Sequence, residues 1–353
     1  MRHYHKVLLF LLLTAVFLIA VYVFITNCFL KENSLIKVTK NEKYHLVKEE
    51  TEIYRRPEAQ QYNVWCVFTK LRGTERSLQN KFKNMLLSLV NTTSVVIKLN
   101  LVVDTSSRYV AKDVVHLVQN ITGKKLEVEY YDVHVLTNKL QDILSIMRPH
   151  FSSQPGAYYS DSLFFLSIGL YKTAPVLQDK VIMLDVDTVI KEDIAQLFEV
   201  FYQFNSTNVF GASPELTPVY HHVLYMYRYK HKNTTLGEPF SSGGFPGVNS
   251  GVLLLHLENM RKSSLYQRML TKEVVDSLAE KYSFKGHLGD QDFYTLISLE
   301  HPELMYLLDC GWNRQLCTWW REHGYRETFH KFSECNSPTK IYHGNCNSII
   351  PEQ

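Results

Sequence analysis

Short apolar segments of two periodicities alternate along this chain from Val64 onward, and this alternation restricts its fold more than any other feature. Residues 64–69 (VWCVFT) are apolar up to Thr69, as in a short buried strand. Residues 78–89 then carry apolar side chains at helical spacing, and residues 95–104 (VVIKLNLVVD) alternate as a strand. Strands that alternate with helices predict an α/β domain with a mainly parallel sheet covered on both faces.

The alternation continues toward the middle of the chain. We expect one face of the second strand to carry Leu99, Leu101 and Val103. The further expected elements are a helix with an apolar face of Val110, Val114, Leu117, Val118 and Ile121, a strand at 126–133, mostly helix over 135–178, a strand at 181–187 and a helix at 192–201. Ligands of such sheets bind beyond the carboxyl ends of the strands.

Two aspartates stand at such a strand end. Asp185 and Asp187 follow the apolar run VIML at spacing i, i+2, which brings both carboxylates within reach of one ion. Unpaired, the two carboxylates would repel each other, whereas a divalent cation removes that penalty and supplies charge for a diphosphate. The alternative is a strand end with solvated acids, because an isolated D-x-D is common.

Two glycine-flanked segments carry further polar side chains. In residues 244–261 (GFPGVNSGVLLLHLENMR), small residues around Asn249 and Ser250 would let the backbone approach a ligand, although a plain loop before a core strand explains them equally. In residues 286–297 (GHLGDQDFYTLI), Asp290 lies where a helix should begin. Helix capping accounts for an acid there, but it does not explain Gln291 as a polar residue facing a cleft.

A late histidine completes the set of candidate ligands. His343 lies in IYHGNCN (341–347), next to a cysteine that we expect to be bridged. A lone histidine is usually a satisfied polar residue. Beside two carboxylates, however, its imidazole would favour Mn²⁺ over Mg²⁺, because nitrogen ligands suit transition metals.

The N-terminus predicts a membrane anchor. Residues 7–30 contain no charged side chain and are long enough to cross a bilayer. A cleaved signal peptide is the alternative, but its apolar stretch would be shorter and end at small residues. Arg2 and Lys6 precede the span, which favours a cytoplasmic tail at 1–6 and a lumenal C-terminal body. Residues 31–62 mix charges without periodicity and are interpreted as a stem, leaving 63–353 as the lumenal domain.

Sequons and cysteines agree with a lumenal body. The sequons Asn91, Asn120, Asn205 and Asn233 are candidate glycosylation sites. Four late cysteines predict two disulfides in an oxidising compartment; a zinc site is the alternative, but no C-x-x-C spacing is present. Three pairings are open, and we favour Cys310–Cys335 with Cys317–Cys346, which would tie the C-terminus to the fold. Cys66 is expected as a free core thiol. The formal charge of +3 is too small to suggest nucleic-acid binding.

The chain resembles glycosyltransferase family 8 over roughly residues 64–353. Four motifs carry this resemblance together: D-x-D after an apolar strand, NSG, LGDQD and a late HGN. The stretch from 287 to 347 and the pair PVYHH and PGVNSGV carry most of the resemblance, and the N-terminal third carries the least. The resemblance implies a GT-A (Rossmann-like) fold, a UDP-sugar donor, Mn²⁺ and retention of anomeric configuration.

The resemblance also implies roles for individual residues. Asp185, Asp187 and His343 would bind Mn²⁺, Gln291 would steady the sugar, and Asp290 is a candidate nucleophile that could equally be a cap. The donor would be held by Phe68, Thr69, Lys70, Val186, Asn249, Ser250, His287 and Leu288. The acceptor would meet Tyr220, His222, Trp320 and Asn345.

Within this family, the sequence resembles most closely the members that transfer xylose. It implies UDP-xylose as the donor and, as the acceptor, a xylose–glucose disaccharide O-linked to EGF repeats of the Notch type. Another family 8 transferase, such as a glucoside xylosyltransferase or a glucosyltransferase, stays open, as does a non-catalytic lectin-like module. The resemblance favours the endoplasmic reticulum membrane, with the Golgi as the alternative.

Overall fold

The computed structural model describes residues 61–71, 76–153 and 162–351, which belong to one compact unit. The predicted tail, membrane span and nearly all of the predicted stem lie outside these ranges. Within the described ranges, every helix is too short or too polar to cross a membrane.

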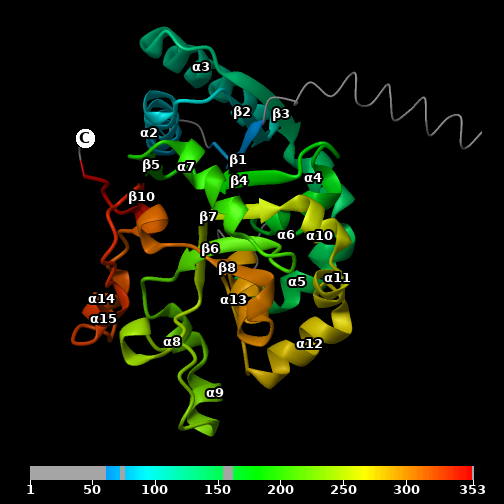
Figure 1. Ribbon diagram of the computed structural model, residues 1–353, viewed down its shortest axis with the longest axis vertical. Helices are drawn as coiled ribbons and strands as arrows, with labels where there is room; N and C mark the ends of the chain where they lie inside the picture. Colours follow the sequence, from blue (N-terminus) through cyan, green and yellow to red (C-terminus); the bar gives the residue numbers. More distant parts are fainter. Residues whose placement is uncertain (1–60, 72–75, 154–161, 352–353) are drawn as a thin grey trace, which may run out of the picture. The chain divides into compact units, whose positions relative to one another are not determined.

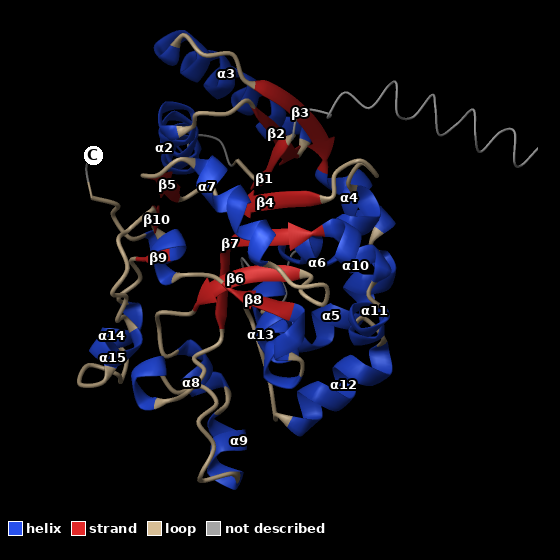
Figure 2. Cartoon of the chain, viewed as in Figure 1, coloured by secondary structure: helices blue, strands red, loops and turns tan. Residues whose placement is uncertain are grey.

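A sheet of seven strands forms the centre of the unit (Figures 1 and 2). Its spatial order is β3 (Glu127–Asp132), β2 (Ile97–Val103), β1 (Tyr62–Phe68), β4 (Lys180–Leu184), β7 (Val248–His256), β6 (Phe210–Pro214) and β8 (Met305–Leu307). Neighbours are parallel except at β7, which is antiparallel to β4 and β6. A small second sheet has the order β5 (Thr188–Ile190), β10 (Ile341–His343) and β9 (Arg314–Gln315).

Helices cover both faces of the main sheet, as predicted (Figure 1). One core contains α2 (Arg76–Thr92), α3 (Thr105–Thr122) and α7 (Ile194–Glu199). The other contains α4 (Val133–Lys139), α5 (Gln141–Phe151), α6 (Leu166–Thr173), α8 (Val219–Val223), α10 (Leu257–Lys262), α11 (Ser264–Met269), α12 (Lys272–Lys281) and α13 (Asp290–Glu300). The remaining short helices are α9 (Tyr225–Lys230), α14 (Trp319–Glu322) and α15 (Phe329–Phe332), with 3₁₀ turns at Ser162–Phe165, Val200–Gln203, Phe240–Ser242, Pro302–Leu304, Cys310–Asn313 and Asn345–Asn347.

The period-two pattern of the strands decides which core each side chain enters. Leu99, Leu101 and Val103 all pack into the core that contains α2 and α3, so the predicted face of this strand is confirmed. The predicted apolar face of α3 is partly wrong, because Leu117 and Ile121 are 45% and 60% exposed. The sheet ends at β3, and the outer side of α3 therefore faces solvent.

Candidate active site

Three side chains of metal-ligand type converge beyond the carboxyl end of β4. The candidate ligand atoms of Asp185, Asp187 and His343 lie within 4.8 Å of one another. Nε2 of His343 is 3.5 Å from Oδ2 of Asp185 and 3.5 Å from Oδ1 of Asp187. Neighbouring ligands around a cation bound at about 2.1 Å lie about 3 Å apart, so small adjustments would place all three around one ion.

Backbone hydrogen bonds bring the three residues together. The N–H of Asp185 donates to the carbonyl of Gly251 on β7 (2.9 Å), and the N–H of Gly344 donates to the carbonyl of Asp187 (2.8 Å). His343 ends β10, which pairs with β5 directly after the two aspartates. A Cβ atom at Gly251 would lie 2.2 Å from Cε1 of His343, so glycine is required where the imidazole crosses the strand.

The charges around the cluster indicate that it is built for a cation. Burial lowers the pKa of His343, but hydrogen bonds to Asp185 and Asp187 and their charges outweigh burial and raise it to about 10. Burial raises the pKa of Asp187, whereas His343 and Lys81 together lower it to about 2. Lys81 on α2, which the sequence analysis missed, places Nζ 3.5 Å from Asp187 and 2.9 Å from Oδ1 of Asn347. A divalent cation could replace the proton on Nε2.

A buried chain of hydrogen bonds links the histidine to Gln291. Nδ1 of His343 lies 3.0 Å from Oδ1 of Asn313, whose Nδ2 donates to Oδ1 of Asn249 (2.9 Å). Nδ2 of Asn249 and Nε2 of Gln291 both donate to Oε2 of Glu215, at 2.9 and 3.2 Å. The sequence analysis missed Glu215, although a carboxylate directly after an apolar strand was an available signal. No local pattern marks Asn313.

Gln291 and Asp290 lie at the first turn of α13, beside Ser250. The N–H of Ser250 donates to Oε1 of Gln291 (3.3 Å), and its hydroxyl donates to Oδ1 of Asp290 (3.0 Å). The hydroxyl of Ser167 donates to Oδ2 of Asp290 (2.5 Å). Burial is the main cause that raises the pKa of Asp290 to about 7. The cap position is Gly289, so the interpretation of Asp290 as a helix cap is wrong.

The NSG segment lies inside β7 rather than in a loop before it. Asn249 pairs with Ser213 of β6, but the register shifts between Ala212 and Ser213. The shift leaves Ser250, Gly251 and Val252 outside the pairing with β6. Such bulges are frequent beside active sites because they redirect side chains, and this one aims Ser250 at α13.

The structure corrects the expectation for Tyr220, which was placed toward the acceptor. Its side chain is fully buried, and its hydroxyl donates to Oδ1 of Asp292 (3.0 Å). Oδ2 of Asp292 accepts from the N–H of Leu288 (2.6 Å). Tyr220 therefore supports the loop before α13 from within the core, and its ring does not reach the surface where an acceptor would bind.

We predict a pH-dependent stability difference between the wild type and Asp292→Asn. Burial raises the pKa of Asp292 to about 7, although hydrogen bonds from Leu288 and Tyr220 oppose the rise. The folded state keeps this proton to near pH 7, whereas an unfolded aspartate loses it near pH 3.9. Its contribution to the free energy of unfolding is therefore largest below pH 4 and declines as pH rises.

In urea denaturation, the free energy of unfolding of the variant minus that of the wild type should accordingly increase from pH 4 to pH 8. Asp142→Asn is the control, because a hydrogen bond from Lys172 lowers the pKa of Asp142 and its difference should stay flat over this range. A flat difference for Asp292→Asn as well would contradict the prediction.

Three of the predicted donor-binding residues, Phe68, Thr69 and Lys70, lie at the end of β1. The ring of Phe68 is fully buried and stacks on Phe82, with centroids 4.4 Å apart, so only the backbone of Phe68 can face a ligand. Thr69 is buried and Lys70 is exposed. The N–H of Lys70 donates to Oδ2 of Asp104, at the end of β2 (2.6 Å).

The other predicted donor residues flank the cluster. Val186 is half-buried between the two aspartates, Leu288 is half-buried against the core, and His287 is exposed. His287 and Leu288 come from the loop that Asp292 holds in place.

Two of the predicted acceptor residues form one aromatic surface. The rings of His222 and Trp320 have centroids 5.1 Å apart, and the ring of Tyr325 contacts both. His222 is exposed, whereas Trp320 is half-buried and packs against the edge of the core.

Asn345, the remaining predicted acceptor residue, begins a 3₁₀ turn that follows His343. In this turn, Cys346 and Asn347 have positive φ angles of 57° and 58°. Oδ1 of Asn345 accepts from the N–H groups of Leu316 (3.0 Å) and Cys317 (2.9 Å). The side-chain oxygen of Asn345 therefore fixes the backbone at Leu316 and Cys317. Only its side-chain NH₂ group is left to contact an acceptor sugar.

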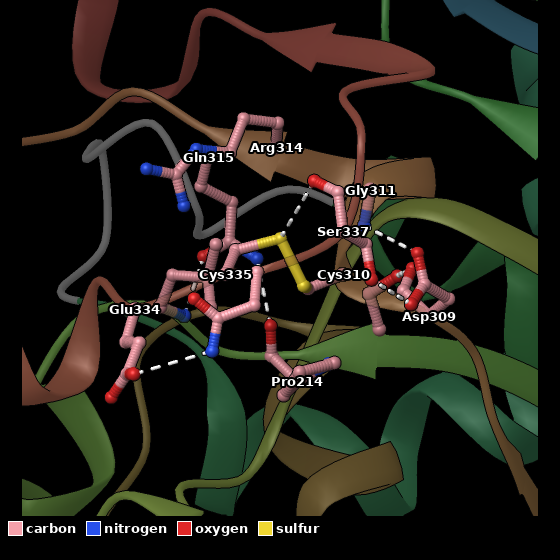
Figure 3. The surroundings of a disulfide bond; sticks show 12 residues. Pro214, Asp309, Cys310, Gly311, Arg314, Gln315, Glu334, Cys335 and Ser337 are labelled. Carbon is pink, nitrogen blue, oxygen red and sulfur yellow. Dashed lines mark hydrogen bonds between the residues drawn. A yellow bond between two sulfur atoms is a disulfide. The ribbon is translucent and has the colours of Figure 1, made fainter. Parts of the chain in front are cut away.

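Both favoured disulfides are present, and Cys66 is a buried free thiol, so these predictions are confirmed. Figure 3 shows Cys310–Cys335, where Asp309 accepts hydrogen bonds from the backbone of Gly311 and the hydroxyl of Ser337. The second bridge links Cys317 to Cys346, directly after the segment that carries His343. The four sequon asparagines, Asn91, Asn120, Asn205 and Asn233, are all exposed, as glycosylation would require.

Comparisons with known proteins agree with this geometry. The model of the family Glycosyl transferase family 8 matches residues 33–345. Xyloside xylosyltransferase 1 of Homo sapiens is 45% identical over 296 residues, which are 82% of this chain and 75% of that protein, and the Mus musculus protein matches equally.

Solved structures match as well. The apo crystal structure of mouse xyloside xylosyltransferase 1 has a TM-score of 0.76 and 43% identity, covering 82% of this chain and all of that one. The galactosyltransferase LgtC, solved with donor and acceptor sugar analogues, has a TM-score of 0.51 at 15% identity over 81% of this chain and 91% of its own, which is a likeness of fold alone. The predicted GT-A-like α/β fold with a mainly parallel sheet is confirmed.

Proposed function

The chain belongs to glycosyltransferase family 8, and from this premise we propose that it transfers xylose from UDP-xylose to the xylose of an O-linked xylose–glucose disaccharide on EGF repeats of the Notch type. The observation that carries the proposal is the convergence of an Asp-x-Asp pair, a histidine and a glutamine at one edge of the sheet. The identity of 45% to xyloside xylosyltransferase 1 supports the choice of xylose over other sugars.

We propose Asp185, Asp187 and His343 as ligands of Mn²⁺. Two carboxylates and one imidazole suit this ion, and Asn313 holds the remote nitrogen of His343, as is usual for metal-binding histidines. When bound, the ion would offset the negative charge that develops on the departing diphosphate. Lys81 is the basic side chain that contacts Asp187 from α2, and it would add positive charge on the same side.

The reaction is proposed to retain anomeric configuration through a front-face displacement. A double displacement would need a free carboxylate nucleophile, and the two oxygens of Asp290 already accept hydrogen bonds from Ser250 and Ser167. Its raised pKa also leaves part of the carboxyl group protonated near neutral pH. Gln291 would instead steady the sugar while the transition state gains oxocarbenium character, and the leaving phosphate would help to deprotonate the acceptor.

The cellular setting forms part of the proposal. A lumenal domain of a single-pass type II protein in the endoplasmic reticulum membrane would meet newly folded EGF repeats. Two disulfides within the described residues and four exposed sequon asparagines suit an oxidising, glycosylating compartment.

The test uses the full-length chain in detergent with Mn²⁺, a panel of UDP-sugars and an EGF repeat that carries the xylose–glucose disaccharide. We expect the repeat to gain the mass of one pentose with UDP-xylose and not with UDP-glucose or UDP-galactose. Addition of a hexose, or addition to a repeat that carries glucose alone, would favour another family 8 activity. Binding of the repeat without release of UDP from any donor would favour a lectin-like module.

We predict that Trp320→Ala separates acceptor recognition from donor chemistry. Trp320 lies beside His222 and is half-buried, and an aromatic ring held on a bridged segment is a good platform for a sugar or a protein surface. Transfer to the EGF repeat should fall about 10- to 100-fold, or about 1.4–2.7 kcal/mol, as expected when a central aromatic contact is truncated, while slow hydrolysis of UDP-xylose persists.

Trp312→Ala is the matched control for this variant. Trp312 is 3% exposed, so its removal should lower the melting temperature and both activities together. If Trp320→Ala behaves in the same way, Trp320 is a core residue and the recognition role is wrong.

A further inference from the structure

We infer that Glu215 sets the direction of every hydrogen bond in the buried chain between His343 and Gln291, and so acts as a positioning residue for both. The inference for His343 depends only on the candidate metal site formed by Asp185, Asp187 and His343, which we call the metal cluster. The inference for Gln291 rests on the proposed function. Neither effect requires Glu215 to touch a substrate or an ion.

Glu215 is a buried carboxylate that accepts hydrogen bonds but forms no ion pair in the part of the chain that the structure describes. It is 2% exposed, and none of the ion pairs among described residues includes it. Oε1 accepts from the N–H of Thr217 (2.9 Å), while Oε2 accepts from Asn249 and Gln291. Because a carboxylate can only accept, both side-chain amides must turn their NH₂ groups toward it.

The orientation imposed on Asn249 continues to the metal cluster. With Nδ2 on Glu215, Oδ1 of Asn249 accepts from the N–H of Gly251 (3.0 Å) and from Nδ2 of Asn313 (2.9 Å). Asn313 then presents Oδ1 to Nδ1 of His343 (3.0 Å), so that Nδ1 must carry a proton. Nε2 is therefore the nitrogen that faces the two aspartates and can bind an ion through its lone pair.

The orientation imposed on Gln291 decides which atom it offers at the sheet edge. Its NH₂ group is used by Glu215, so the carbonyl oxygen lies beside the N–H of Ser250 (3.3 Å). An oxygen at this position can accept a sugar hydroxyl or stabilise positive charge on the sugar ring, whereas an NH₂ group would do neither.

Glu215→Gln tests the inference because it keeps the shape and changes only the donor pattern. One end of the new amide carries an NH₂ group, which must face either the N–H of Thr217 or the NH₂ groups of Asn249 and Gln291. Either choice places donor against donor, or reverses the amides along the chain. We expect the Mn²⁺ dissociation constant of the full-length chain, measured by electron paramagnetic resonance, to rise about 10-fold, as for loss of a group that orients a metal ligand.

Transfer provides the second readout. In saturating Mn²⁺, Glu215→Gln should lower kcat more than it raises the KM for UDP-xylose, because the reversed Gln291 loses an interaction of the transition state. Gln178→Leu is the control, since Gln178 is 3% exposed and links Trp65 to Asn100 before β4, away from the cluster. It should lower stability and leave the Mn²⁺ affinity unchanged.

Asn313→Leu is a second variant, which tests the same chain of hydrogen bonds if Glu215→Gln does not fold. It removes the acceptor of His343 directly and should weaken Mn²⁺ binding about 10- to 100-fold. Combined with Glu215→Gln, the effects on Mn²⁺ affinity should be less than additive, because both act through one chain. Normal Mn²⁺ affinity in either folded variant, or full additivity, would overturn the inference. If the wild type binds Mn²⁺ but transfers no xylose, the proposed function fails while the inference for His343 stands.

Discussion

Replacing Asp187 by asparagine should abolish glycosyl transfer while the fold survives. The substitution removes one anionic ligand from a cluster in which His343 lies 3.5 Å away. If the ion contributes several kcal/mol to the transition state, turnover should fall on the order of 1,000-fold, since each 1.36 kcal/mol is a factor of ten. The measurements are UDP release and transfer to the proposed EGF acceptor at saturating Mn²⁺, together with circular dichroism to establish folding.

Asp142→Asn is the matched control for this substitution. Asp142 forms an ion pair with Lys172 on the surface, with an N–O distance of 2.6 Å, and its side chain is 61% exposed. It should keep normal turnover, because exposed ion pairs contribute little and this one is remote from the cluster. Near-normal turnover of Asp187→Asn in Mn²⁺ would show that the assignment of the metal site is wrong.

Removing the Cys317–Cys346 disulfide should lower both stability and Mn²⁺ affinity. The bridged cysteines are 29 residues apart, and a loop of this size predicts a loss of about 3–4 kcal/mol in the free energy of unfolding of the double serine variant. Cys346 lies in the turn after His343, and Asn345 in the same turn holds the backbone of Cys317. Opening the bridge should therefore loosen His343 as well.

The Cys310–Cys335 bridge is the matched control. Its cysteines are 25 residues apart, so the double serine variant should lose nearly the same free energy of unfolding. It lies beside Asp309 and Ser337 (Figure 3), and its Cys310 begins the turn that ends at Asn313. Its removal should therefore weaken Mn²⁺ binding less than removal of the Cys317–Cys346 bridge, which lies in the turn directly after His343 itself. Equal effects of the two bridges on Mn²⁺ binding would contradict a specific role for Cys317–Cys346.

Local patterns in the sequence were sufficient wherever one segment decides its own structure. The alternation of apolar periods predicted β1, α2 and β2, because a strand or helix buries one face whatever partner it meets. The position of Asp185 and Asp187 after an apolar run placed them at a carboxyl strand end, where ligands of α/β sheets bind. The roles of individual residues in the site came from the resemblance to the family rather than from these patterns.

Register and long-range packing decided the rest. Tyr220 is part of the core, where its hydroxyl donates to Asp292, a residue far along the chain. Asn345 turns inward because two N–H groups near residue 317 require an acceptor. Ser250 lies outside the pairing with β6 because β7 bulges there, which no local pattern in the sequence predicts.

Glu215 and Asn313 show most clearly that local sequence does not reveal long-range partners. Each is an ordinary polar residue in its own segment, and nothing within a few positions reveals its partner. Their hydrogen bonds join β7, α13 and the segments that follow β6 and precede β9, which are brought together only by the folded sheet. A buried polar group must find its partner wherever the tertiary structure offers one, so its role depends on contacts that local sequence does not encode.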